Sequence, residues 1–206
     1  VRNTMPTKPV EAKKTGIEVL TAAELMALGK EQPTELSTLP LCGAEGYVVK
    51  GWSHLLVGLP KVGKTETLFV SVLDWVEQGH SVLWLSEESK AVWAARLASG
   101  GPGGEAADRF RVAFALGHPP DELLELAATS DADVIVVDTI RNLAGIRDEN
   151  DNAEIARMLG QWEARLQGKT RVYVHHRRKE TGDHGTEVAG GTMMVGSVDR
   201  VLVLER

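Results

Sequence analysis

Cysteine, excess basic charge and long apolar runs are all scarce in this sequence, and each scarcity excludes a class of protein. Cys42 is the only cysteine in 206 residues, so an internal disulfide is excluded and a reducing cytoplasm fits. The formal net charge is -6, so no global basic field holds nucleic acid. No apolar run approaches the roughly 20 residues of a membrane span, and no signal peptide is visible. We therefore expect a cytoplasmic protein without a membrane partner.

The hydrophobic content of 43% is enough for one globular domain with a sizeable core. Residues 1–46 are expected to be a flexible N-terminal segment with a short helix, because residues 1–19 are polar and show no clear period. Within them, Thr21 and Glu24 have the spacing of a capping box, which predicts a short helix. Residues 47–206 are expected to form the main domain.

In that main domain, short apolar runs alternate with longer amphipathic stretches. The runs cover residues 54–57, 81–85, 111–115, 134–137, 171–175 and 201–204, and helical stretches lie near 64–78, 89–98, 121–129 and 151–167. Alternation of this kind predicts an α/β fold, a doubly wound, mostly parallel sheet with helices on both faces.

One segment between an apolar run and a helical stretch fits the pattern G-x-x-x-x-G-K-T. Its residues are Gly58, Leu59, Pro60, Lys61, Val62, Gly63, Lys64 and Thr65. The glycines let the backbone N–H groups curl around phosphates, the lysine adds a positive charge and the threonine offers a hydroxyl to Mg²⁺. The segment therefore predicts a P-loop that binds ATP and Mg²⁺, with Glu66 in the helix that follows it.

Two acidic positions complete the predicted site. Asp138 ends the run Val134–Val137, where an aspartate can hold a metal-bound water beside the phosphates. Residue 139 is threonine, so the general base must come from elsewhere, and Glu88 after the second run is the candidate. Glu87 is expected to point elsewhere. The alternative is that both glutamates are solvated acids at a helix start.

The order of these motifs, followed by the run that ends in His176, resembles the RecA-like ATPases. The closest likeness is to the RepA-type branch of ring helicases and related AAA-type ATPases of phages and plasmids, over residues 50–206. The stretches 138–145 and 190–192 carry much of that likeness. The resemblance implies a homohexameric ring, with ATP sites between subunits and DNA in the central channel.

Three roles follow from the resemblance. It makes His176 the polar sensor of the γ-phosphate, and it makes Arg206 an arginine finger that reaches the neighbouring subunit, with Arg200 as the alternative. The loop that begins with Arg177, Arg178 and Lys179 faces the channel in such proteins, so these three residues are expected to contact single-stranded DNA.

Three functions remain open on the sequence alone. The first is a ring-forming, DNA-associated ATPase of helicase type. The second is a nucleotide switch that controls assembly without motor activity. The third is a small-molecule kinase that uses residues 177–191 as a lid, although a kinase usually needs more lid arginines than this segment contains. The motif order favours the first.

Overall fold

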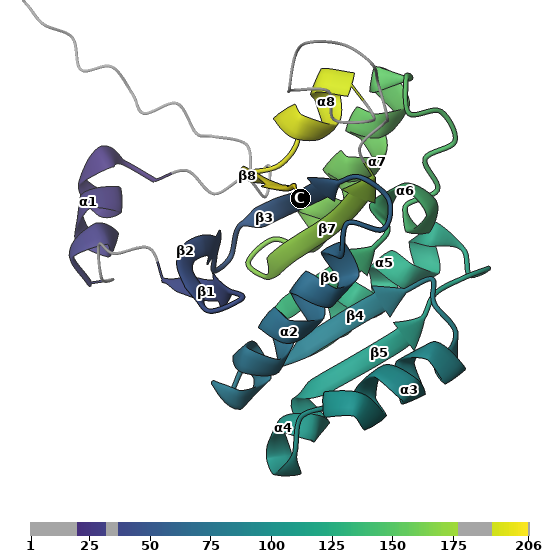
Figure 1. Cartoon of the computed structure of the whole chain (residues 1–206). Coiled ribbons are helices and arrows are strands. Elements are labelled where there is room, and N and C mark those ends of the chain that lie inside the picture. The colour runs from purple at the N-terminus through teal and green to yellow at the C-terminus, as the bar shows by residue number, and fades with distance from the viewer. Residues whose placement is uncertain (1–19, 32–36, 177–190, 206) are drawn as a thin grey trace, which may run out of the picture. The chain divides into compact units, whose positions relative to one another are not determined.

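The computed structural model describes residues 20–31, 37–176 and 191–205 (Figure 1). The chain divides into two compact units, Val1–Leu36 and Ser37–Arg206. In the first unit, helix α1 (Ala22–Glu31) begins at the predicted capping box. The Thr21 backbone N–H donates to Glu24 Oε2 at 2.6 Å, and the Glu24 backbone N–H donates to Thr21 Oγ1 at 3.3 Å. These two bonds satisfy N-terminal polar groups of the helix and confirm the capping box.

A six-stranded sheet with the order β5-β4-β6-β7-β3-β8 forms the centre of the second unit, and every neighbouring pair is parallel. Its strands are β3 (Ser53–Gly58), β4 (Val82–Ser86), β5 (Phe110–Phe114), β6 (Val134–Asp138), β7 (Thr170–His176) and β8 (Arg200–Leu204). Each strand corresponds to one of the six predicted runs. The predicted parallel α/β fold is confirmed, and the carboxyl ends of the strands meet at one edge.

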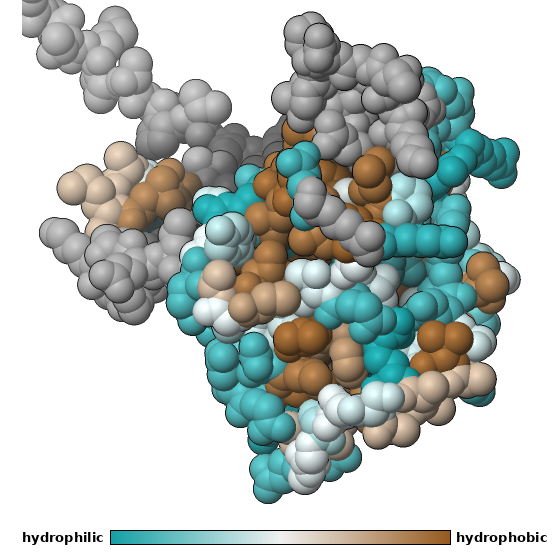
Figure 2. All heavy atoms as spheres, in the orientation of Figure 1, coloured by the Kyte–Doolittle hydropathy of each residue, from teal (hydrophilic) through white to brown (hydrophobic). Residues whose placement is uncertain are grey.

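Helices cover both faces of this sheet (Figure 1). On one face lie α2 (Lys64–Glu77), α3 (Lys90–Gly100) and α4 (Gly104–Arg109). On the other lie α5 (Pro120–Thr129), α6 (Ile140–Leu143), α7 (Asn152–Arg165) and α8 (Gly191–Gly196). The outward side of α2 and α3 exposes apolar residues among hydrophilic ones, Val70 and Val92 included (Figure 2).

The second compact unit begins at Ser37, ten residues before the boundary expected at residue 47. A hairpin of β1 (Thr38–Leu41) and β2 (Ala44–Val49) belongs to it and was not foreseen. Leu39 and Val48 are fully buried against α2, and the Trp75 indole donates to Pro40 O at 2.6 Å. Long-range burial, which local composition does not reveal, ties this hairpin to the sheet.

Helix α3 extends to Gly100 and α4 begins at Gly104, where buried Ala106 packs into the same apolar cluster as Trp93 and Phe69. Along the parts of the chain that the structure describes, no helix is long and apolar enough to cross a membrane.

Candidate active site

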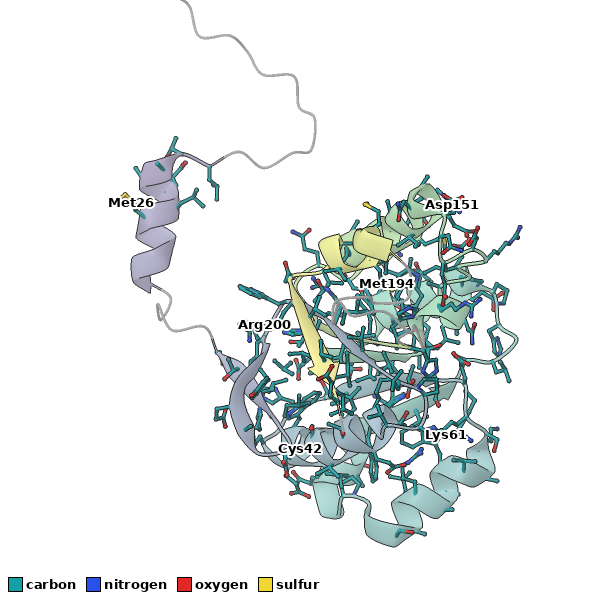
Figure 3. The ribbon with its side chains drawn as sticks, turned by 45° about the horizontal axis from the view of Figure 1, so that its top comes forward. Met26, Cys42, Lys61, Asp151, Met194 and Arg200 are labelled. Atoms are coloured by element: carbon teal, nitrogen blue, oxygen red, sulfur yellow. The ribbon has the colours of Figure 1, made fainter. Side chains whose placement is uncertain are left out.

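The loop between β3 and α2 has the shape that phosphate binding requires. A side chain at Gly58 would place its Cβ 2.7 Å from Leu204 O and 2.9 Å from Val62 Cγ1, so only glycine fits there. Gly63 has a φ of 103° in the left-handed region and gives α2 no side-chain cap. The N–H groups of the first turn are therefore directed at an anion in front of the helix. Figure 3 labels Lys61 in this loop.

Lys64 is the cation of the loop and is only 4% exposed. Its Nζ donates to Gly58 O at 2.9 Å, to Leu59 O at 3.0 Å and to His176 Nδ1 at 3.0 Å. Burial lowers the pKa of Lys64, while Asp138 opposes that shift. The Lys64 ammonium group is thus held at the mouth of the loop by three acceptors. Phosphate oxygens are better partners for an ammonium group than carbonyl oxygens are.

Thr65 and Asp138 meet beside the lysine, and their chemistry fits Mg²⁺. The Thr65 hydroxyl donates to Asp138 Oδ2 at 2.8 Å, which brings a hydroxyl and a carboxylate together at the edge of the sheet. Burial raises the pKa of Asp138 to about 6; the Thr65 hydrogen bond opposes this rise, and the charges of Glu88 and Glu87 add to it. A divalent cation bound there would compensate the negative charge of a buried carboxylate that has two acidic neighbours.

His176 reaches this site because β7 lies directly beside β3, with His176 paired to Gly58 in the register of the two strands. Burial, and next the charge of Lys64, lower the pKa of His176, so its ring is neutral at pH 7. Lysine can only donate, so Nδ1 accepts from Lys64 and the ring proton is on Nε2. Nε2–H is then a donor for a phosphate oxygen. The neighbouring His175 is buried, 3.9 Å from Glu149.

Glu88 and Glu87 follow β4 and diverge. The Glu88 carboxylate accepts from Arg96 Nη1 at 2.5 Å and from Nη2 at 3.2 Å. The Glu87 carboxylate accepts from Thr139 N at 2.8 Å, from Thr139 Oγ1 at 2.6 Å and from Asn142 Nδ2 at 2.9 Å. Glu87 therefore holds the turn after β6, and its charge acts on both Asp138 and His176, so the expectation that it points elsewhere stays a prediction. The role of Glu88 as the base stays a prediction.

Arg96 is a site residue that the sequence did not reveal, because a single arginine on α3 belongs to no motif. It also binds Glu66, whose Oε1 accepts from Arg96 Nη2 at 2.9 Å. Glu66, expected to bind the cofactor, thus directs its carboxylate to α3. The pairing of α3 with α2 follows from tertiary packing, which sequence spacing alone does not specify.

The remaining predicted residues lie at the end of the chain or in the predicted channel loop. Arg206, Arg177, Arg178 and Lys179 fall outside the residues that the structure describes. Arg200, the alternative finger, lies on β8 (Figure 3) and donates to Gly46 O and to Tyr47 O of its own chain.

The fold and the phosphate loop, with Thr65, Asp138 and His176 beside it at one sheet edge, define a P-loop nucleotide-binding protein. The chain belongs to the AAA domain family (AAA_25), whose model matches residues 23–182. A solved structure of the RadB recombinase is similar, with a TM-score of 0.54 and 21% identity over 79% of this chain and 77% of that chain. That likeness establishes the RecA-like fold. The search of curated proteins gave no match. The chain is a P-loop ATPase of RecA-like type.

Proposed function

We propose that this ATPase hydrolyses Mg²⁺-bound ATP, forms a ring, as a hexamer, and acts on single-stranded DNA in the manner of a RepA-type helicase. The observation that carries the hydrolytic part is the convergence of Lys64, Thr65, Asp138 and His176 at one edge of the sheet. Four polar groups from two strand ends and one helix start meet there, which is the arrangement that phosphoryl transfer needs.

In this reaction the loop N–H groups and Lys64 hold the phosphates, and Thr65 with Asp138 holds the metal. Mg²⁺ supplies charge neutralisation at the phosphates when bound. Glu88 takes a proton from the attacking water, whose oxygen forms a bond to the γ-phosphorus. The bond to the bridging oxygen breaks, its electron pair stays with ADP, and inorganic phosphate is released. His176 donates from Nε2 to a γ-phosphate oxygen.

The ring and the DNA rest on the resemblance and on the order of the chain. Residues 177–179 follow the sensor His176 by one to three positions, so a change at the γ-phosphate has a short path to them. A ring would repeat this basic cluster around one axis, which concentrates positive potential although the whole chain is acidic. Arg206 would then complete the site of the neighbouring subunit.

Turnover of ATP with and without single-stranded DNA tests the proposal, beside a panel of nucleoside monophosphates as acceptors. Stimulation by DNA supports the ring ATPase, and slow turnover that DNA leaves unchanged favours an assembly switch. Transfer of the γ-phosphate to a monophosphate would establish a kinase instead. Lys64→Ala is the control, since removal of the point charge in the loop should abolish ATP turnover in all three cases.

A second experiment tests the ring. If the sites are shared between subunits, turnover per subunit rises with protein concentration. Mixing Arg206→Ala with Lys64→Ala subunits should restore part of the activity, because each subunit supplies what its neighbour lacks. Full activity of a monomer at every concentration rejects both the finger and the ring.

A further inference from the structure

Arg96 on α3 is held by two carboxylates at once. Its Nη1 and Nη2 contact the two oxygens of Glu88 at 2.5 and 3.2 Å. Its Nε and Nη2 contact Glu66 Oε1 at 3.1 and 2.9 Å. The Arg96 side chain is 11% exposed, whereas those of Glu88 and Glu66 are 38% and 63% exposed. The arginine is therefore the buried, fixed member of the group, and the glutamates are its more exposed partners.

Two aromatic rings pack against the Arg96 guanidinium. Its centre lies 4.7 Å from the Trp93 ring and 5.9 Å from the Phe69 ring, within the range of cation–π attraction. Trp93 is itself 1% exposed and packs edge-on to Trp84 at 5.0 Å. Because Trp93 sits in the apolar core, the plane on which Arg96 lies is rigid.

The backbone of Glu88 is tied to the same support. Ser86 Oγ, at the end of β4, accepts from the Glu88 N–H at 3.0 Å and from the Trp93 indole N–H at 2.8 Å. The Ser86 Oγ atom thus connects the backbone N–H of Glu88 to the Trp93 ring against which Arg96 packs. Both the main chain and the carboxylate of Glu88 are anchored to one cluster.

The surroundings of these pairs are partly apolar, and the Arg96 side chain is 11% exposed within them. Arg96 and Glu66 line a hollow of about 480 Å³ between α2 and α3, and most of its other walls are apolar, among them Phe69, Leu73 and Val92. Low polarity near a charged pair strengthens its attraction relative to an exposed surface pair. The Arg96 contacts are therefore more than a solvated surface ion pair.

We propose that Arg96 is a positioning residue that holds the general base Glu88 in its productive place. The inference rests on the proposed hydrolysis, because it names the residue that orients the base of that reaction. A glutamate has several rotatable bonds, and a base loses rate steeply when its carboxylate strays from the attacking water. A planar guanidinium fixes both carboxylate oxygens at once, which a lysine ammonium cannot do. Glu66 braces Arg96 from the P-loop helix.

Steady-state kinetics of Arg96→Ala test this role by separating kcat from KM. We expect kcat for ATP hydrolysis to fall by about 10-fold or more while KM changes by less than about threefold, since the phosphate loop is untouched. The kcat of Arg96→Lys should lie between the kcat of the unmodified protein and that of Arg96→Ala. Guanidinium ion at low millimolar concentration should restore part of the activity of Arg96→Ala. Arg109→Ala is the matched control, because Arg109 pairs with the exposed Glu105 on α4, away from Glu88.

A double-mutant cycle shows whether Arg96 acts through Glu88. In a Glu88→Gln background, Arg96→Ala should cause no further loss of kcat, because the base is already absent. An unchanged or raised kcat in Arg96→Ala overturns the inference, as does a loss that multiplies with Glu88→Gln. If Arg96→Ala does not fold, the same cycle with Arg96→Lys decides by the same criteria.

The two hypotheses fail in different ways. If Lys64→Ala and Glu88→Gln lose turnover but neither Arg96 variant does, only the positioning role is wrong. If Lys64→Ala keeps the turnover of the unmodified chain, the proposed hydrolysis is wrong, and the role of Arg96 falls with it.

Discussion

Asp138→Asn should stabilise the protein in the absence of Mg²⁺ and nucleotide while it destroys the metal site. Asp138 is 9% exposed, and burial raises its pKa from 3.8 to about 6. At about 1.4 kcal/mol for each pH unit, that rise costs the native state about 3 kcal/mol at pH 7. Asparagine avoids the buried charge, and its carbonyl can still accept from Thr65. Because its amide needs a new acceptor, the net gain is expected to be about 1 to 3 kcal/mol.

The sign of the pH dependence follows from the same shift. A carboxylate whose pKa is higher in the folded protein binds more protons there than in the unfolded chain. Its contribution to stability is therefore full below pH 3.8 and is lost as pH rises through about 6. The stability difference between Asp138→Asn and the unmodified protein should accordingly grow between pH 4 and 7 and level off above that.

Urea unfolding in EDTA, at a series of pH values, measures this difference. Thermal unfolding offers a second readout, with an expected rise of about 2 to 4 °C per kcal/mol for a unit of this size. Asp133→Asn is the matched control with the opposite sign. Although partial burial opposes it, hydrogen bonds from Ser81 lower the pKa of Asp133, so its loss should destabilise the protein at pH 7.

Two results would refute the reasoning. One is an Asp138→Asn variant that is less stable than the unmodified protein at pH 7. The other is a stability difference that does not change between pH 4 and 7, since burial of the charge would then not be the cause. If the stabilised variant still showed Mg²⁺-dependent turnover, the metal role of Asp138 would be wrong.

The remaining predictions concern catalysis, DNA and acid stability. Glu88→Gln should lower ATP hydrolysis by about 10²-fold or more with nucleotide binding retained, and Glu87→Gln should do much less; the reverse order in a turnover assay would place the base at Glu87. Alanine at all of residues 177–179 should weaken single-stranded DNA binding and flatten its salt dependence, and an unchanged salt slope would place any DNA contact elsewhere. Burial lowers the pKa of His54, so its contribution to the stability measured by urea unfolding should fall as pH drops below about 6.5; a His54→Gln variant should lose less stability than the unmodified protein over that range, and His118→Ala should lose as much.

Local patterns in the sequence were sufficient to predict the secondary-structure elements and the phosphate-binding loop. The six apolar runs correspond to six strands because buried parallel strands need short, continuous β-rich segments. The loop from Gly58 to Thr65 was recognisable because every residue of the phosphate cradle is contiguous. The capping box at Thr21 is local in the same way. In each case the physical requirement acts within a few residues, so spacing alone expresses it.

Tertiary structure decided which distant residues meet. Lys64 and His176 are 112 residues apart, and they touch because the register pairs Gly58 with His176. The hairpin from β1 to β2 joined the main unit through burial against Trp75, which is invisible in the composition of residues 37–46. Arg96 became a partner of Glu88 only when α3 packed on the aromatic cluster. Periodicity indicates which face of a helix or strand is buried, whereas strand order and helix packing determine which residues that face is buried against.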